Sequence, residues 1–262
     1  MLAHVQFNQA LKVMRGANAR LITAEQLAYA RTHAEQGGES SLSRSGSYTL
    51  AGFVHLKGEM PIRVARSPLV NVRLAGLAVK ANRAGNYFSD SEQVYERFAK
   101  QAEEDKSKDP EKRRAVVLPN NKPFQVSSRA NPDVFRHIFG KAGEDYLQFM
   151  GRNSITVYPV DVNTVNAQDE TILTQEWLSG LDDGSNVYGD ERSLNYNYAV
   201  RGVQRTGGAS SQKKSSTGAI TQYSTKQLDR LIKVMQGVRE GKLPASRLER
   251  EIKFAESLRS NE

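Results

Sequence analysis

Apolar and polar positions along the chain change repeatedly between helical and strand spacing, but not in the regular strand–helix–strand order of a parallel sheet. Helical spacing predicts helices at residues 3–15, 24–36, 68–84, 89–102 and 131–150. Alternation or short apolar runs predict strands at residues 48–57, 62–65, 115–118, 154–162 and 194–203. This irregular order favours an α+β fold over a doubly wound α/β fold.

Local signals mark the boundaries of several predicted helices. Thr23 and Gln26 fit a capping box, in which each residue's side chain bonds the other's backbone N–H. Ser67 followed by Pro68 favours a helix start, because serine caps well and proline suits the first helical position. Gly85 is a natural end for the helix that follows.

Two polar segments divide the rest of the chain. Residues 103–114 mix acidic and basic side chains around a proline, which predicts a solvated connector. The second segment, residues 206–218, is rich in Gly, Ser and Lys, and this composition predicts a flexible linker. We therefore predict an α+β fold with mixed helices and short strands in one core domain at residues 1–205. A basic helical hairpin follows the linker at residues 219–262.

Composition excludes several kinds of site. The chain has 262 residues, 38% of them hydrophobic, which is enough for one large domain. It has no cysteine, so disulfides, cysteine-ligated metals and thiol nucleophiles are absent. The first residues lack the basic start and apolar run of a secretory signal, and no apolar run is long enough to span a bilayer. We expect a cytoplasmic protein, or one carried inside a virion, without a membrane partner.

Charge is distributed unevenly. The net charge is +8 and the pI is near 9.6, which indicates nucleic acid or another polyanion as a partner. The interval between Arg152 and Arg192 nevertheless has no Lys or Arg. It holds eight acidic residues, namely Asp161, Asp169, Glu170, Glu176, Asp182, Asp183, Asp190 and Glu191. The basic excess therefore lies in the remainder of the chain.

The acidic interval has two interpretations. Carboxylate oxygens suit Mg²⁺, so a metal-dependent nuclease or related phosphodiester enzyme using residues 161–191 is one alternative. The turn at residues 182–186 departs from the calcium-loop pattern, because its glycine stands at the third position. The other interpretation is an acidic surface that contacts a basic surface of another subunit. We predict the surface, and no metal site.

The C-terminal part of the chain carries the candidate nucleic-acid-binding residues. Two lysines lie in the predicted linker and six basic residues lie on the predicted hairpin helices. They are Lys213, Lys214, Arg230, Lys233, Arg239, Arg247, Arg250 and Lys253. A lysine or arginine side chain can contact a phosphate wherever it is long enough to reach it, because the contact depends mainly on charge. A regulatory protein that binds nucleic acid through this hairpin is therefore a second alternative. The apolar stripes of both helices also predict a protein partner or self-association through the hairpin.

The sequence contains no recognisable catalytic motif. It lacks a G-x-S-x-G elbow, a phosphate-binding G-x-x-x-x-G-K-[ST] loop, a G-x-G-x-x-G turn and an H-E-x-x-H helix. The histidines, His4, His33, His55 and His137, lie far apart in the chain. No segment carries a motif specific to a known protein family. We therefore predict no catalytic residue and no cofactor.

The leading hypothesis is a non-enzymatic binding or assembly protein that works beside nucleic acid. It would suit a structural or accessory component of a phage, viral or mobile-element complex. The acidic interval and its basic flanks would allow head-to-tail contact between copies, because complementary charge fixes register and speeds association.

Overall fold

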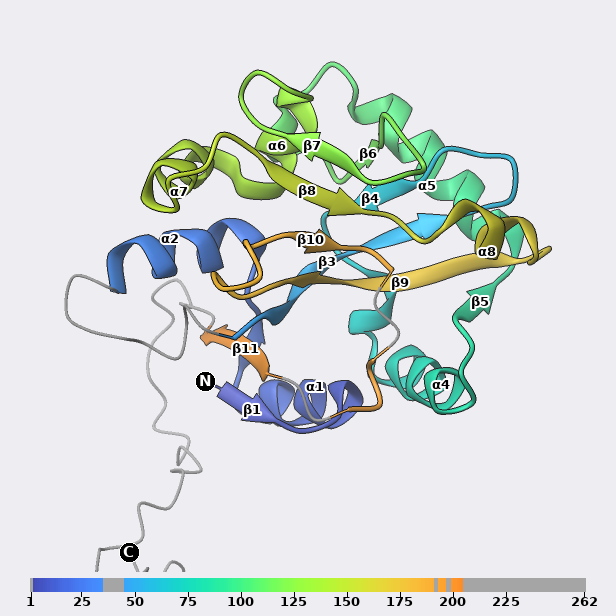
Figure 1. The fold of residues 1–262 in the computed structure, drawn as a ribbon. Helices are drawn as coiled ribbons and strands as arrows, with labels where there is room; N and C mark the ends of the chain where they lie inside the picture. The colour runs from blue at the N-terminus through green and yellow to red at the C-terminus, as the bar shows by residue number, and fades with distance from the viewer. Residues whose placement is uncertain (1, 35–44, 191–192, 197–198, 205–262) are drawn as a thin grey trace, which may run out of the picture. The chain divides into compact units, whose positions relative to one another are not determined.

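The structure is a computed structural model, and it describes residues 2–34, 45–190, 193–196 and 199–204 (Figure 1). All of these belong to one compact unit, Met1–Thr206. The predicted linker at residues 206–218 and the predicted hairpin at residues 219–262 lie outside the described residues.

The main element of this unit is a curled sheet in which the described residues supply 11 strands. The strands are β1 (Leu2–His4), β2 (Ala19–Leu21), β3 (Ser47–His55), β4 (Ile62–Val64), β5 (Phe88–Asp90), β6 (Ala115–Val117), β7 (Phe124–Val126), β8 (Ile155–Tyr158), β9 (Thr171–Leu178), β10 (Val187–Tyr188) and β11 (Ala199–Gln204). The main path runs β1-β11-β3-β9-β10-β8-β7, and β2, β4, β5 and β6 branch from it. The pairs β3–β11 and β8–β10 are parallel and the others are antiparallel, so the sheet is mixed.

Helices cover both faces of this sheet (Figure 1). The α-helices are α1 (Phe7–Gly16), α2 (Ala24–Ala34), α4 (Val72–Arg83), α5 (Glu92–Asp105), α6 (Pro132–Phe139), α7 (Gly143–Phe149) and α8 (Val162–Asn166). Short 3₁₀ turns are η2 (Pro68–Val70), η3 (Pro110–Lys112) and η4 (Gly140–Ala142). Among the described residues, no helix combines the length and the apolar character needed to cross a bilayer.

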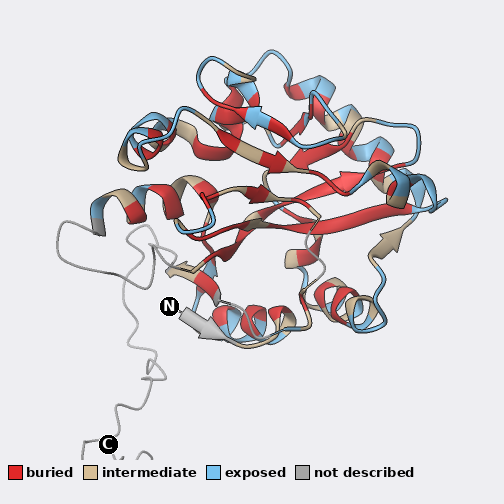
Figure 2. Ribbon diagram, in the orientation of Figure 1, coloured by how far each residue is buried: buried red, intermediate tan, exposed pale blue. Residues whose placement is uncertain are grey.

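Two large apolar clusters lie on opposite faces of the sheet. One joins α1, α4 and α5 to β3, and the other joins α2, α6 and α7 to β7 and β8. Neighbouring residues of β3 point into different clusters, because successive strand side chains alternate between faces. Val54 packs into the first cluster and Phe53 into the second, and both are fully buried. Figure 2 shows this burial continuing along β3 and β9 at the centre of the unit.

The predicted fold class was wrong. The sequence predicted short strands mixed with helices, whereas the described residues form one curled mixed sheet with helices packed on it. The main reason is β9, which was not predicted, although with β3 it forms the centre of the sheet. Both faces of β9 are buried, so its sequence TILTQEWL has no polar–apolar alternation to reveal it.

The predicted capping box at Thr23 is confirmed, whereas the helix predicted to start at Pro68 begins later. The Thr23–Gln26 capping box forms, with both reciprocal hydrogen bonds at 3.1 Å. Ser67 caps a turn as predicted, but the turn is the short η2, and Asn71 caps a new helix, α4, by accepting from the backbone of Arg73. The predicted single helix is therefore two elements, because a second capping side chain lies one turn after the first.

The predicted solvated connector at residues 103–114 is held by a buried carboxylate. Asp105 is fully buried and accepts hydrogen bonds from the side chains of Arg114 and Lys108. It also accepts from the backbone N–H of Arg114, which fixes the chain as it enters β6. Bonds from these two cations hold the pKa of Asp105 well below its usual range. This segment is therefore ordered by ion pairs and hydrogen bonds to one buried carboxylate, and not mainly by burial of apolar side chains.

Candidate functional site

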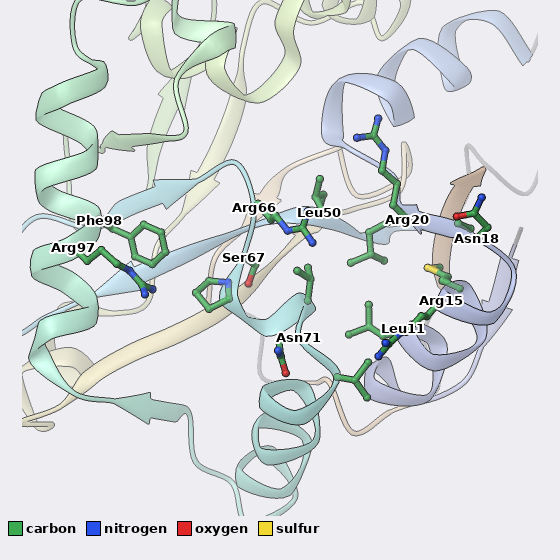
Figure 3. Close-up of a pocket in the computed structure, with 16 residues that line it drawn as sticks. Leu11, Arg15, Asn18, Arg20, Leu50, Arg66, Ser67, Asn71, Arg97 and Phe98 are labelled. Atoms are coloured by element: carbon green, nitrogen blue, oxygen red, sulfur yellow. The ribbon is translucent and has the colours of Figure 1, made fainter. Parts of the chain in front are cut away.

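A pocket of about 620 Å³ opens between α1, α5 and the segment that enters α4 (Figure 3). Its floor is apolar and is formed by Leu11, Met14, Leu21, Leu50, Val70 and Phe98. Its polar lining comes from Asn18, Ser67, Asn71 and four arginines, Arg15, Arg20, Arg66 and Arg97. Binding pockets for small molecules commonly have volumes of about 300–1,000 Å³ and apolar walls with a few polar groups.

An irregularity in β3 creates the floor of the pocket. The register between β3 and β9 shifts between Tyr48 and Gly52, so the backbone groups of Leu50 are free to bond elsewhere. The Leu50 N–H donates to the carbonyl of Ile22 at 2.8 Å, and its carbonyl accepts from the Ser67 N–H at 2.9 Å. These two bonds bring the chain before α2 and the chain before η2 to the same point of the sheet.

Gly52 allows the η2 segment to lie directly on β3. A Cβ atom at this position would lie 2.6 Å from Ser67 Oγ and 2.6 Å from the carbonyl oxygen of Thr174. Real Cβ atoms do not approach other atoms so closely, and the Thr174 oxygen belongs to backbone that cannot rotate away. The wall that carries Arg66 therefore depends on a glycine at this position.

We expect Gly52→Ala to lower the free energy of unfolding by about 2–3 kcal/mol, because the added methyl overpacks a filled site. Gly76→Ala is a matched control in the middle of α4, where the nearest atom to a new Cβ is Asn8 Nδ2 at 3.9 Å. The control should raise stability by about 0.5–1 kcal/mol, as alanine favours a helix interior over glycine. Urea unfolding of both variants measures the difference. Equal stability of the two variants would contradict this account of Gly52.

The four arginines are the main electrostatic feature of the pocket. None of the described residues that line it is Asp or Glu. All four are exposed, and none of their guanidinium groups forms a hydrogen bond or ion pair with another described residue. Arg97 instead lies over the ring of Phe98, 4.7 Å from its centroid. Figure 3 shows Arg15, Arg66 and Arg97 on three sides of the pocket, whereas the Arg20 side chain points toward α2.

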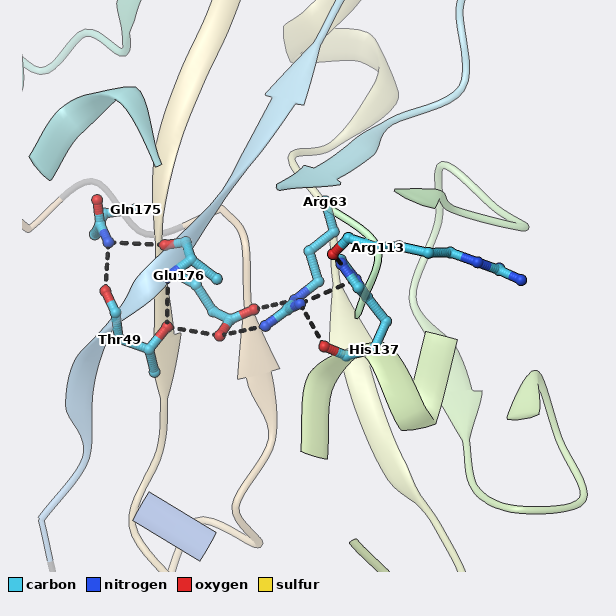
Figure 4. A network of polar contacts seen from close by, with 7 residues as sticks. Thr49, Arg63, Arg113, His137, Gln175 and Glu176 are labelled. Carbon is cyan, nitrogen blue, oxygen red and sulfur yellow. Dashed lines mark hydrogen bonds and ion pairs between the residues drawn. The ribbon is translucent and has the colours of Figure 1, made fainter. Parts of the chain in front are cut away.

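A buried polar network stabilises the same irregularity in β3 (Figure 4). Gln175 Nε2 donates to the carbonyls of Thr49 and Ala51, at 2.5 and 2.7 Å. Thr49 Oγ1 accepts from the Ala51 N–H and donates to Glu176 at 2.6 Å. Backbone groups that lose their partners where β3 and β9 part are thus bonded by side chains of β9.

The network continues through a buried ion pair. Arg63, from β4, donates to both carboxylate oxygens of Glu176, at 2.5 and 3.1 Å. The same arginine donates to the carbonyl and to Nδ1 of His137, at 2.9 and 3.0 Å. Because arginine only donates, His137 Nδ1 accepts, and its Nε2 donates to the carbonyl of Arg113. Burial and the adjacent Arg63 lower the pKa of His137 to about 3, so the ring is neutral.

Among the described residues, His33, His55 and His137 do not form a catalytic group with a carboxylate. His55 is buried, and neither of its ring nitrogens has a hydrogen-bond partner among the described residues. Burial lowers the pKa of His55 to about 3. His33 is exposed and stacks on Tyr29. His55 and His137 therefore act as neutral core residues.

The acidic interval is dispersed over the unit. Glu176 is in the buried ion pair, Asp161 caps α8, Asp169 pairs with the exposed Lys57, and Glu170 accepts a hydrogen bond from Ser89. Asp182 and Asp183 lie exposed in a turn, Asp190 is half-buried, and Glu191 is outside the described residues. Within the described part of the chain, no three His, Cys, Asp or Glu side chains are grouped so as to hold a metal ion.

The predicted nucleic-acid-binding residues, from Lys213 to Lys253, all lie outside the described residues. The arginines of the pocket were not predicted, although the sequence carries a signal for Arg15, Arg20 and Arg66. Residues 1–24 and 60–89 contain no Asp or Glu, and they include eight Lys or Arg residues. These two acid-free stretches supply α1, β2, η2 and α4, which surround most of the pocket.

Comparison with known proteins gives the fold but not a function. No protein-family model matches the chain, and no curated protein matches it. One solved structure does match, described as "Accommodation of massive sequence variation in Nanoarchaeota by the C-type lectin fold". The fold is similar to a C-type lectin fold. The TM-score is 0.50 and the sequence identity is 15%, over 76% of this chain and 95% of the other. At this identity the likeness concerns the fold alone.

Proposed function

We propose that this chain is a non-enzymatic binding protein whose ligand is anionic and occupies the arginine-lined pocket. The observation that carries the proposal is a concave space lined by four arginines, which have no partner and meet no lining carboxylate among the described residues. Grouped cations repel one another, so the arrangement brings the free chain no stability. An anionic ligand would neutralise this repulsion and accept hydrogen bonds from the guanidinium N–H groups.

The kind of cation favours a ligand that bears phosphate or carboxylate. A guanidinium group is planar and presents paired N–H donors that match two oxygens of one phosphate or carboxylate. The described residues that line the pocket include four arginines and no lysine. Its apolar floor would accept a flat organic group beside the anion. A nucleotide has both features.

The fold is compatible with such a role. The similar structure is described as a C-type lectin fold that accommodates massive sequence variation. A scaffold whose framework tolerates changed side chains can carry different binding sites on one backbone. The ligand of this chain must therefore be inferred from its own pocket.

Calorimetric titration with inorganic pyrophosphate and with thymidine monophosphate at low salt tests the proposal. Both probes should bind the full-length chain, and the double variant Arg66→Ala/Arg97→Ala should bind at least about tenfold more weakly, as charged hydrogen bonds are removed. Arg129→Ala is the control, because Arg129 is exposed and lies outside the pocket. Failure of the wild type to bind either probe would contradict the proposal, and so would an equal weakening in the control.

A further inference from the structure

A row of basic side chains leads away from the pocket. Helix α4 starts at the pocket wall, where Asn71 and Val72 line it, and extends for 12 residues, about 18 Å. Arg73 and Lys80 are exposed along this helix, which packs beside α1. A ligand confined to the pocket would leave Lys80, about two turns farther along the helix, without a function.

Helices α1 and α4 themselves contain no acidic residue. α1 and α4 both come from the acid-free stretches, residues 1–24 and 60–89. Exposed helices usually alternate charges, since pairs of opposite sign at a spacing of three or four residues stabilise a helix. α4 has only cations, so its outer face keeps an uncompensated positive potential. That pattern suits a ligand with repeated negative charges.

Arg97 offers a flat surface inside the pocket. The Phe98 ring, which is 9% exposed, supports the guanidinium group at 4.7 Å from the ring centroid. Arg97 also lines the cavity, so its planar guanidinium group is available to a ligand there. Nucleic-acid bases stack on arginine planes as well as on aromatic rings. The pocket therefore combines phosphate-binding groups with a stacking surface for one base.

The geometry points to a single strand of nucleic acid as the ligand, with one unstacked base in the pocket and its phosphates along α4. This inference rests on the proposed function and specifies its ligand. A duplex fits less well, because its bases are stacked and paired and cannot enter a pocket without being flipped out. An anionic membrane also fits less well. On α1 and α4, the large apolar side chains exposed among the described residues are Val13 and Leu77, too few to insert into lipid.

Fluorescence anisotropy with a labelled oligothymidylate of about ten nucleotides, within the usual site size for single strands, tests the inference. We expect the full-length chain to bind it at least about tenfold tighter than thymidine monophosphate, through added phosphate contacts. Arg73→Ala/Lys80→Ala should lower the oligonucleotide affinity by about tenfold, and the log–log salt slope by roughly 0.7 for each phosphate that a removed cation had neutralised. The same variant should bind the monophosphate within about twofold of the wild type, because the pocket is unchanged.

Lys122→Ala/Arg129→Ala is the matched control, since it removes two exposed cations elsewhere on the unit. Its oligonucleotide affinity should equal that of the wild type. Thermal unfolding confirms that each variant is folded. Arg97→Lys keeps the positive charge but removes the planar guanidinium group on which a base could stack. It should therefore weaken binding of the oligothymidylate. An abasic strand of equal length binds more weakly, and its affinity should not change in this variant.

The different failures are distinguishable. If neither the monophosphate nor the oligonucleotide binds, both the proposed function and this inference are wrong. If the monophosphate binds but the oligonucleotide binds no tighter, only this inference is wrong. Tighter binding of the matching duplex would overturn it as well. So would binding to phosphatidylserine vesicles that depends on Arg73 and Lys80, with no oligonucleotide binding.

Discussion

Glu176→Ala is expected to lower the free energy of unfolding by about 3–5 kcal/mol, the usual cost of removing one partner of a buried ion pair. The pair is almost completely enclosed, with Arg63 3% exposed and Glu176 fully buried. Removal of the carboxylate leaves the Arg63 charge in the core and takes the acceptor of Thr49. Denaturant unfolding followed by circular dichroism measures the decrease.

Asp169→Ala is the control for that result. Asp169 also pairs with a cation, Lys57, but the two side chains are 94% and 53% exposed. Such a surface pair contributes no more than about 1 kcal/mol. If both substitutions had equally small effects, the buried network would not be a main source of stability.

Stability should fall steeply in mild acid. His55 and His137 have a pKa near 3 in the folded chain against an ordinary value of 6.5. Below pH 6.5 the unfolded chain binds protons that the folded chain does not, so acid favours unfolding. The stability contributed by both rings is complete above that pH and is lost as the pH falls toward 3. Between pH 7 and pH 4.5 the expected decrease is about 5 kcal/mol for the two residues.

The variant His55→Leu separates this effect from general acid sensitivity. It removes one of the two proton sites, so the decrease in unfolding free energy between pH 7 and pH 4.5 should be about half that of the wild type. The slope against pH is the readout, and it does not depend on how stable the variant is at pH 7. An unchanged slope would mean that His55 is not buried in its neutral form. The carboxylate of Asp105, whose pKa is lowered, contributes a further decrease only at lower pH.

The sequence predicted the elements whose signals are local. The capping box at Thr23 and the strands β3 and β4 were correctly predicted, because the determining residues are close together in the chain. β9 was not predicted, because polar side chains such as those it carries usually indicate a surface segment. They are compatible with a core only when buried hydrogen-bond partners satisfy them. Gln175 and Glu176 are bonded by residues more than 100 positions away, so only the folded chain shows that they suit a core.

For the candidate site, too, the local features of the sequence were visible and the long-range ones were not. Charge segregation was visible in the sequence, and it drew attention to the acidic interval and to the C-terminal cations. The arginines of the pocket are spread along the chain from Arg15 to Arg97. They form one group only in the folded chain, where α1, η2 and α5 lie around the same pocket. The absence of acidic residues from residues 1–24 and 60–89 would have been the useful signal. Depletion of one charge type is less conspicuous than a cluster of the other.

The place of β11 in the sheet affects how the chain can fold during its synthesis. This strand, Ala199–Gln204, pairs with β1, β2 and β3, all of which leave the ribosome much earlier. Until it emerges, the nascent chain exposes strand edges that have no partner, and such edges are prone to wrong pairing. Contacts between such distant segments also slow folding. The sheet is thus completed only after nearly the whole unit has been translated.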